Sequence, residues 1–435
     1  MRDIALFLGF VAMLLPAFRY PHVGVLLWCW TAMAVPTYYV WSFMGSVSLN
    51  KIAAAATLMA WLASREPKKL PMSSTLALLA MYAVLGTLSV LFRLPDTDVG
   101  FREWEKFVKI LLFAFAIAGI VKTKNHVDSV LYAIFISLGF HGVLGGAKFL
   151  ATGGSHKVWG PGDSIIGDNN HFALAMTALL PIVFYLYKQS DRRAVRLALI
   201  GSSILVMASI MGTSSRGGLI GIAALGGYAL LRTRKKLKYL LAIIPLVAAA
   251  VAFAPASWTS RMDTIAGADE DSSFMLRVIA WKQSAMIALD HPILGGGFHA
   301  VQDRKVWADY AFKFDSALRF IQTPPINPSV PRAAHSIYFQ VLGDMGFLGL
   351  MIFIAILVSS WRNSSAVIRN ARNRPEWLWA SDLATALQYS LVAYIISGAA
   401  LGMAYFDYIF VVFALLVVVR SMVEVPLISR RFGEH

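Results

Sequence analysis

Three basic side chains in otherwise apolar surroundings have the chemistry to act on a phosphorylated substrate. Arg216 lies in GTSSRGG (212–218), Arg277 lies in SSFMLRVIAWKQSAMIALDHP (272–292), and His335 precedes SIYFQVLGDMG (336–346). Guanidinium groups bind phosphate through paired hydrogen bonds, and histidine accepts protons near neutral pH. A set of this kind suits an enzyme that binds a phosphate group and moves a proton.

The segment around Arg216 has the features of an anion-binding helix start. Ser214 or Ser215 can cap a helix, and Gly217 with the glycine after it leaves backbone N–H groups open. An arginine that only reaches out to the membrane interface is the alternative, but it needs no flanking glycines. We therefore predict that Ser215, Arg216 and Gly217 contribute to substrate binding.

The segment around Arg277 predicts an amphipathic helix over residues 273–290, in which Arg277, Trp281 and Ser284 share one face. An ordinary solvated arginine is the alternative. Arg332, in the proline-rich stretch that follows, is a further candidate for substrate binding.

Below His335, the polar residues Ser336, Gln340 and Asp344 recur every four positions in an apolar helix. A polar stripe of this kind faces protein or a water-filled cavity rather than lipid. The sequence predicts His335 as a proton acceptor with Ser336 and Gln340 nearby, and a capping or packing histidine is the alternative.

A fourth polar cluster lies in GPGDSIIGDNNHFA (160–173), where Asp168, Asn170 and His171 gather at the start of an apolar run. These side chains could ligate a divalent cation or form a hydrogen-bonded helix cap, and we favour the cap. Asp168 and Asn170 are also candidates for substrate binding, as are Trp281, Ser336 and Gln340. The chain has no paired-histidine, paired-cysteine or nucleotide-binding glycine motif in a suitable context, so no metal and no cofactor is predicted. We interpret His299, after the glycine run, as structural.

The elements that must position these residues are membrane helices. The chain has 435 residues, of which 58% are hydrophobic and 14% charged, against about a quarter charged in soluble domains. Apolar runs of about 18 to 22 residues match a bilayer about 30 Å thick, and the short alternating segments of a barrel are lacking. The formal net charge of +15 is explained by basic cytoplasmic loops rather than by nucleic acid. The single cysteine, Cys29, permits no internal disulfide, and residues 3–18 are expected to be a retained membrane segment.

We predict an all-α polytopic membrane protein with about 12 crossings. The candidate spans are 3–18, 22–35, 50–64, 73–92, 104–121, 126–149, 171–188, 195–212, 216–232, 237–254, 336–360, 380–402 and 404–422. The loops at 65–69, 122–128, 188–196, 232–238 and 361–382, with the tail 420–435, carry 21 Lys or Arg against 7 Asp or Glu, which predicts that they are cytoplasmic. An N-terminus on that side requires that one of the first three apolar segments does not cross.

This topology divides the chain into three parts. Residues 1–254 are an N-terminal membrane bundle, 255–335 are a long outer loop, and 336–435 are the last membrane helices with a cytoplasmic tail. The long loop carries eight basic and eight acidic residues, so charge bias between the two sides does not explain its arginines.

In order and topology, the segments around Arg216, Arg277 and His335, with the long loop between the last two, resemble the O-antigen ligase (WaaL) family. More broadly, they are similar to the superfamily of O-antigen ligases, polymerases and protein O-glycosylation ligases. The opening MRDIALFL and the segment GDNNHFA look like the O-glycosylation ligase subgroup. Asp344 departs from the glutamate common at that position.

The resemblance implies a GT-C-like helical fold and a metal-independent glycosyltransferase in the bacterial inner membrane, with its active site on the periplasmic side. The donor would be a glycan on undecaprenyl pyrophosphate, and the acceptor a sugar hydroxyl of lipid A–core. Arg216 and Arg277 would hold the pyrophosphate, and His335 would act as base or position the acceptor. Besides these substrates, the expected partners are membrane lipids.

Other functions remain open from the sequence. A polymerase or a protein O-oligosaccharyltransferase of the same superfamily would share the donor and differ in the acceptor. A transporter or flippase would show paired broken helices in two related halves, which the sequence lacks. A non-catalytic membrane scaffold would tolerate loss of Arg216 and His335.

Overall fold

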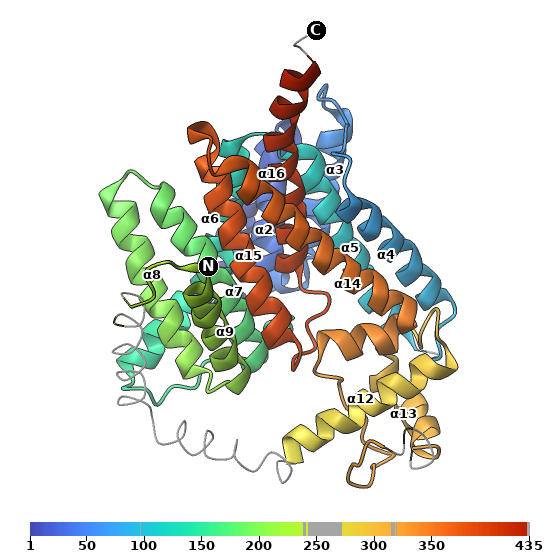
Figure 1. The fold of residues 1–435 in the computed structure, drawn as a ribbon. Helices are drawn as coiled ribbons and strands as arrows, with labels where there is room; N and C mark the ends of the chain where they lie inside the picture. Colours follow the sequence, from blue (N-terminus) through green and yellow to red (C-terminus); the bar gives the residue numbers. More distant parts are fainter. Residues whose placement is uncertain (96, 238–240, 242–271, 315–317, 319, 433–435) are drawn as a thin grey trace.

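The computed structural model describes residues 1–95, 97–237, 241, 272–314, 318 and 320–432, and every regular element within these ranges is a helix (Figure 1). The helices are α1 (Arg2–Arg19), α2 (Pro21–Met33), α3 (Leu49–Ala63), α4 (Ser74–Leu91), α5 (Asp98–Ile120), α6 (Lys124–Ala151), α7 (Asn169–Gln189), α8 (Arg193–Gly212), α9 (Arg216–Arg232), α12 (Ser272–Asp290), α13 (Arg304–Ala311), α14 (Ile337–Ala371), α15 (Leu378–Gly398) and α16 (Asp407–Phe432). Short 3-10 helices, η1 (Pro36–Tyr39), η2 (Phe43–Ser46), η3 (Ala300–Gln302) and η4 (Pro375–Trp377), lie between them.

The chain is a polytopic helical membrane protein. Among the described helices, α4, α6, α7, α8 and α14 are long and apolar enough to cross a membrane by length and composition. Each predicted span other than 237–254 coincides with a helix, and 237–254 lies almost wholly outside the described residues. The predicted number of crossings does not follow from these lengths, because α2 has only 13 residues, about 20 Å at 1.5 Å per residue.

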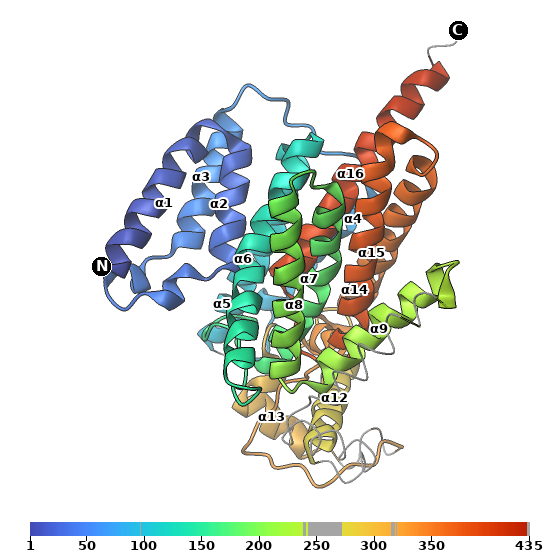
Figure 2. The same cartoon turned by 90° about the vertical axis from the view of Figure 1, so that its left-hand side faces the viewer.

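The bundle has two ends with different characters. The helix ends next to most of the basic loops, including those of α3, α5, α14 and α16, lie toward the top of Figure 1, and we call this the basic end; the end of α9 lies lower, about halfway up. The helices α12 and α13 gather at the bottom, below the ends of α5, α7 and α9, as Figure 2 also shows. We call this lower end the loop end. The separation places the predicted long loop opposite the basic connections.

The N-terminus lies at a different end from the one predicted. The backbone N–H groups of Ser42 and Met44 both donate to Asp3 Oδ1, each at 3.1 Å. Asp3 therefore lies beside the connection between α2 and α3, which belongs to the loop end, and not at the basic end. The helices α1, α2 and α3 run antiparallel as a three-helix group (Figure 2). All three can be counted as crossings, and α4 then still runs from the basic end toward the loop end.

The core of the bundle is centred on α16. From Tyr408 to Val419 no residue of α16 is more than 2% exposed. A helix that is apolar all round can only be stable when it is surrounded, by protein or by lipid, and here protein surrounds it. The helices that contact α16 include α5, α14 and α15.

The helix α14 is broken near the loop end, and the glycine run after α12 donates hydrogen bonds to the carbonyls that the break leaves without helical partners. Gly346 has φ 68° and ψ −168°, so the backbone carbonyls before it lose their helical partners. The N–H groups of Gly296 and Gly297 donate to the carbonyls of Gly343 (2.8 Å) and Asp344 (3.0 Å). The N–H of Phe347 donates to the carbonyl of Pro292 at 2.8 Å. The 292–297 segment thus fixes α12 against the kink.

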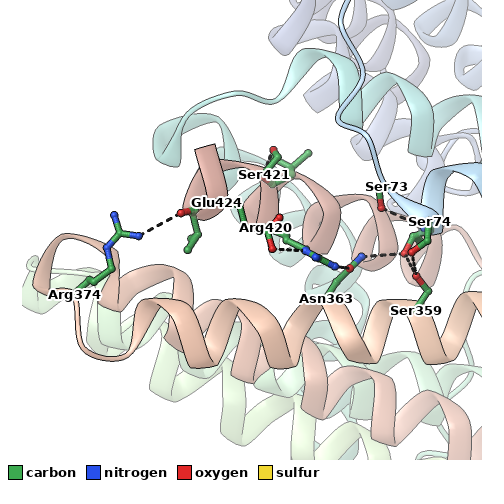
Figure 3. A network of polar contacts seen from close by, with 11 residues as sticks. Ser73, Ser74, Ser359, Asn363, Arg374, Arg420, Ser421 and Glu424 are labelled. Atoms are coloured by element: carbon green, nitrogen blue, oxygen red, sulfur yellow. Dashed lines mark hydrogen bonds and ion pairs between the residues drawn. The ribbon is translucent and has the colours of Figure 1, made fainter. Parts of the chain in front are cut away.

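A polar network joins α4, α14 and α16 near the basic end (Figure 3). Arg420 Nη1 donates to Asn363 Oδ1 (2.7 Å), and Asn363 Nδ2 donates to Thr75 Oγ1 (2.9 Å). The Ser359 hydroxyl lies 2.7 Å from the Thr75 hydroxyl and 2.8 Å from that of Ser74. Arg374 reaches the same region by donating to the carbonyl of Val423 at 3.3 Å. Such satisfied buried networks fix one packing arrangement among apolar helices.

Candidate active site

The start of α7 is a capped helix N-terminus. Asp168 Oδ1 accepts from the N–H groups of Asn170 (2.8 Å) and His171 (3.4 Å), which is the cap that the sequence favoured over a metal site. Asn169 Nδ2 donates to the carbonyl of Thr213 at 2.8 Å, so this helix start is tied to the turn before α9. Within the described residues, no group of three or more His, Cys, Asp or Glu side chains is arranged as metal ligands.

The start of α9 is capped in the same way. Ser215, one of the two predicted caps, accepts from the N–H of Gly218 at 3.1 Å. A Cβ at Gly218 would lie 2.7 Å from Ala173 Cβ, so the glycine allows α9 to approach α7 closely. Gly217 has more room, and its carbonyl accepts from Ser397 Oγ at 3.2 Å. Arg216 is the first residue of the helix and is half-buried.

The predicted amphipathic helix is α12, and its shared face contacts α14. The indole of Trp281 stacks on Phe339 with ring centroids 5.1 Å apart and an interplanar angle of 7°. Trp281 Nε1 donates to the carbonyl of Ala334 at 2.5 Å, and Ser284 lies against Gly343. Arg277 is one turn before Trp281 on the same face, so α12 brings it toward the residues that precede α14.

His335 lies directly before the N-cap of α14, with its side chain exposed and its backbone at φ 43°. Although the residue is open to solvent, neighbouring protein atoms remove part of the water around its imidazole, which lowers the pKa of His335, and the nearby positive charge of Arg277 lowers it further. His171 and Arg332 act in the same direction, and the carboxylate of Asp168 acts against them. The imidazole is therefore neutral near pH 7, which is the form that accepts a proton.

The polar stripe below His335 holds the loops around the site together. Gln340 Oε1 accepts from the N–H of Ala404 at 3.1 Å. Asp344 accepts from Tyr405 Oη (2.9 Å) and from the N–H of His299 (3.1 Å). Ser336 is buried, and its hydroxyl has no hydrogen-bond partner among the described residues. The stripe faces protein and a cavity, as predicted, and Gln340 and Asp344 both accept hydrogen bonds from backbone N–H groups.

One loop links the α9 start to His335. A Cβ at Gly217 would lie 3.9 Å from Leu401 Cδ1, and a Cβ at Gly402 would lie 3.8 Å from the backbone of His335. Adjacent residues of the α15–α16 connection thus contact both positions. The predicted groups around Arg216, Arg277, Asp168 and His335 form one neighbourhood at the loop end.

A cavity of about 830 Å³ opens beside His335. Of the predicted site residues, His335 and Gln340 line it. The others lie outside the lining, on the starts of α7 and α9, on α12 and on the segment before α14; they are Asp168, Asn170, Ser215, Arg216, Gly217, Arg277, Trp281, Arg332 and Ser336. The volume is in the range of small-molecule sites.

The cavity also contains residues that the sequence interpretation left out. His299, which was interpreted as structural, lines the cavity, and so do Lys51, Glu103 and Lys106. His171, from the predicted cluster at the start of α7, lines it as well. The Nδ1 atom of His171 lies 2.9 Å from the carbonyl oxygen of Ile165, which fixes the orientation of that ring. Burial lowers the pKa of His299, while the carboxylate of Glu103 raises it.

Backbone strain is concentrated in the cavity wall. Four non-glycine residues with left-handed backbone conformations line it, namely Val35 (φ 44°), Asp163 (φ 58°), His299 (φ 70°) and His335 (φ 43°). Each such conformation costs on the order of 1–3 kcal/mol and persists only where the surrounding structure imposes it. Residues of this kind gather at functional sites, so the strain independently marks the cavity.

Comparisons with known proteins agree with this location. A family model described as O-Antigen ligase matches residues 201–354, which include α9, α12 and the first half of the kinked α14. A second model, described as a family of unknown function (DUF5935), matches residues 1–191. No curated protein sequence matches the chain.

Proposed function

Because residues 201–354 make this chain a member of the O-antigen ligase family, we propose that it transfers a glycan from a lipid pyrophosphate to an acceptor hydroxyl. The donor is a glycan on undecaprenyl pyrophosphate, and the acceptor is a sugar hydroxyl of lipid A–core. The reaction takes place at the loop end, on the periplasmic side of the bacterial inner membrane. The observation that carries the proposal is a neutral, exposed His335 at a cavity, with Arg277 close enough to affect its pKa.

The chemistry is a displacement at the anomeric carbon. The acceptor oxygen forms a bond to that carbon, and its proton passes to the His335 imidazole. The bond from the anomeric carbon to the phosphate oxygen breaks, and its electron pair leaves with the lipid pyrophosphate. Because the donor is already activated, ATP is not required, and a single displacement inverts the anomeric configuration.

Arg216 and Arg277 stabilise the negative charge that grows on the leaving pyrophosphate. The N-terminus of α9, capped by Ser215 at the N–H of Gly218, adds the partial positive charge of its helix dipole. Removing one such donor typically lowers the rate by about 10²–10³, and removing a general base lowers it by about 10²–10⁴. These guanidinium groups supply positive charge that could otherwise come from a divalent cation, so we expect chelators not to inhibit.

The test is transfer in vitro from a purified undecaprenyl-pyrophosphate glycan to lipid A–core. We expect His335→Ala and Arg216→Ala to abolish transfer while both proteins still insert and purify normally. Arg232→Ala, at the other end of α9, is the matched control and should retain activity. Wild-type transfer rates in His335→Ala would exclude the base role.

The same assay separates the acceptor alternatives. Extension of a repeat-unit lipid instead of lipid A–core would identify a polymerase, and modification of a pilin-like protein would identify a protein O-oligosaccharyltransferase. These activities use the same displacement and differ only in what presents the hydroxyl. Loss of activity with EDTA, restored by a divalent cation, would contradict the metal-independent mechanism.

A further inference from the structure

The cavity has a second, charged wall on α3 and α5 that the proposed chemistry does not use. Lys51, Glu103, Lys106 and Lys109 line it. Lys106 Nζ pairs with Glu103 at 2.8 Å, within α5. Lys51 Nζ of α3 and Lys109 Nζ of α5 both pair with Glu105, at 2.7 Å and 3.4 Å. Ion pairs therefore connect the two helices at the edge of the cavity.

The charges are confined to the first half of α5. Beyond Lys109, α5 is apolar and largely buried, from Ile110 through Ile120. Ionisable groups in an otherwise apolar bundle usually face a protein interior or a water-filled cavity and mark a substrate path. Lysines that merely reach the membrane interface are the alternative, but these lysines line a cavity and pair with glutamates.

The charges nearly balance, which indicates what the wall can bind. Three lysines are set against Glu103 and Glu105, so the wall differs from a paired-guanidinium phosphate site. It presents ammonium donors beside carboxylate acceptors. A sugar hydroxyl both donates and accepts hydrogen bonds, so alternating ammonium and carboxylate groups suit it.

An aromatic floor lies beside this wall. Phe298, Tyr405 and Phe406 line the cavity. The ring of Phe298 lies 5.3 Å from that of Tyr405 and 5.2 Å from that of Phe107 on α5. An apolar floor with a few converging polar groups is the usual composition of a small-molecule site. The three rings are largely buried (Phe298 0%, Phe406 2% and Tyr405 7% exposed), so they form the apolar base of the cavity and the polar contacts fall to the charged wall.

We propose that the α3–α5 wall is the acceptor subsite and that it binds the sugar headgroup of a glycolipid acceptor through Lys51, Glu103 and Lys106. This inference rests on the proposed function, because a displacement needs its nucleophile and its leaving group on opposite sides of the anomeric carbon. With the pyrophosphate on the side of Arg216 and Arg277, the acceptor approaches from the other side of His335. All three lysines of the cavity lining, Lys51, Lys106 and Lys109, lie on the α3–α5 wall.

A site-directed labelling experiment tests this subsite. The only cysteine, Cys29, is fully buried and can be replaced by serine to give a background without thiols. Lys106→Cys places a reporter in the wall, and Lys51→Cys is a second reporter if the first variant folds poorly. Arg102→Cys is the matched control, because Arg102 is exposed on the same helix one turn earlier and does not line the cavity.

We expect purified lipid A–core, or a repeat-unit lipid, to slow maleimide labelling of Lys106→Cys several-fold and to leave Arg102→Cys unchanged. The undecaprenyl-pyrophosphate donor alone should give no protection. Protection by the donor, by a pilin-like protein alone, or by none of these probes would overturn the inference.

Kinetics give a second readout. Glu103→Gln should raise KM for the acceptor about tenfold, which corresponds to about 1.4 kcal/mol, with KM for the donor unchanged. A larger effect on the donor would overturn the subsite. If the wild-type protein transfers the glycan but the acceptor protects neither cysteine reporter from maleimide, only the subsite is refuted. If the acceptor protects the reporters but the wild-type protein transfers no glycan, the proposed function is refuted.

Discussion

Trp281 Nε1 donates a hydrogen bond to the carbonyl of Ala334, at 2.5 Å, one residue before His335. The indole ring is held in place by its stack on Phe339 in the first turns of α14. One side chain of α12 thus fixes the backbone that carries the proposed base. Arg277, one turn earlier on α12, is positioned by the same contact.

Trp281→Phe should lower the transfer rate without unfolding the protein. Phenylalanine keeps the stack on Phe339 and loses the hydrogen bond, which contributes about 1 kcal/mol. Because catalysis depends closely on the position of the reacting groups, we expect kcat to fall about tenfold or more. The measurement is kcat beside the thermal unfolding midpoint, and an unchanged kcat would show that Trp281 does not position His335.

The pH dependence of kcat/KM should reflect the environment of His335. Its pKa lies below the usual 6.5, so the base is already neutral at pH 7. The rate should fall only as the pH drops through the lowered pKa. Arg277→Gln removes a positive charge that lowers this pKa, so the acid limb should move to higher pH. Arg277→Lys keeps the charge and should leave the limb in place, and identical limbs in all three proteins would contradict this.

The local parts of the site could be predicted from the sequence. Ser215 and Asp168 cap helices where the residue types indicated a cap, and the apolar runs coincide with helices. Both features depend on residues within a few positions of one another. A cap needs only a side-chain oxygen and the next two or three N–H groups.

The parts that were missed depend on contacts between distant segments. His299 comes to the cavity because its N–H donates to Asp344, 45 positions away, across a kink that the sequence did not indicate. Lys51 of α3 pairs with Glu105 of α5 only after α3 packs beside α5. Asp3 reaches Ser42 and Met44, so the N-terminus lies at the loop end rather than at the basic end. No periodicity within a helix encodes these pairings.

Gly346→Ala should destabilise the protein, because Gly346 is needed for both its conformation and its space. Its φ is 68°, and a Cβ there would lie 2.6 Å from the carbonyl oxygen of Pro292. The left-handed conformation alone costs a non-glycine residue roughly 1–2 kcal/mol, and the overlap adds to this.

Gly201→Ala is the matched control, since it lies within α8 and no atom comes within 4 Å of its Cβ position. There alanine should raise the unfolding midpoint, because it favours a helix by about 1 kcal/mol over glycine. Equal effects of the two changes would contradict the kink geometry.

Asn363→Ala should reduce stability and leave catalysis unchanged. Asn363 is 1% exposed, donates to Thr75 and accepts from Arg420, so alanine breaks the link between α4 and α16. Thr75 keeps its hydrogen bond with Ser359, and Arg420 keeps its ion pair with Glu424 at 2.7 Å. These remaining contacts limit the loss in the free energy of unfolding to about 1–3 kcal/mol. Asn363→Asp should recover part of it, because the carboxylate accepts from Arg420 and from the Thr75 hydroxyl. No residue of this network lines the cavity, so kcat and both KM values should match the wild type. A change in acceptor KM would show instead that the two ends of the bundle are coupled through α14.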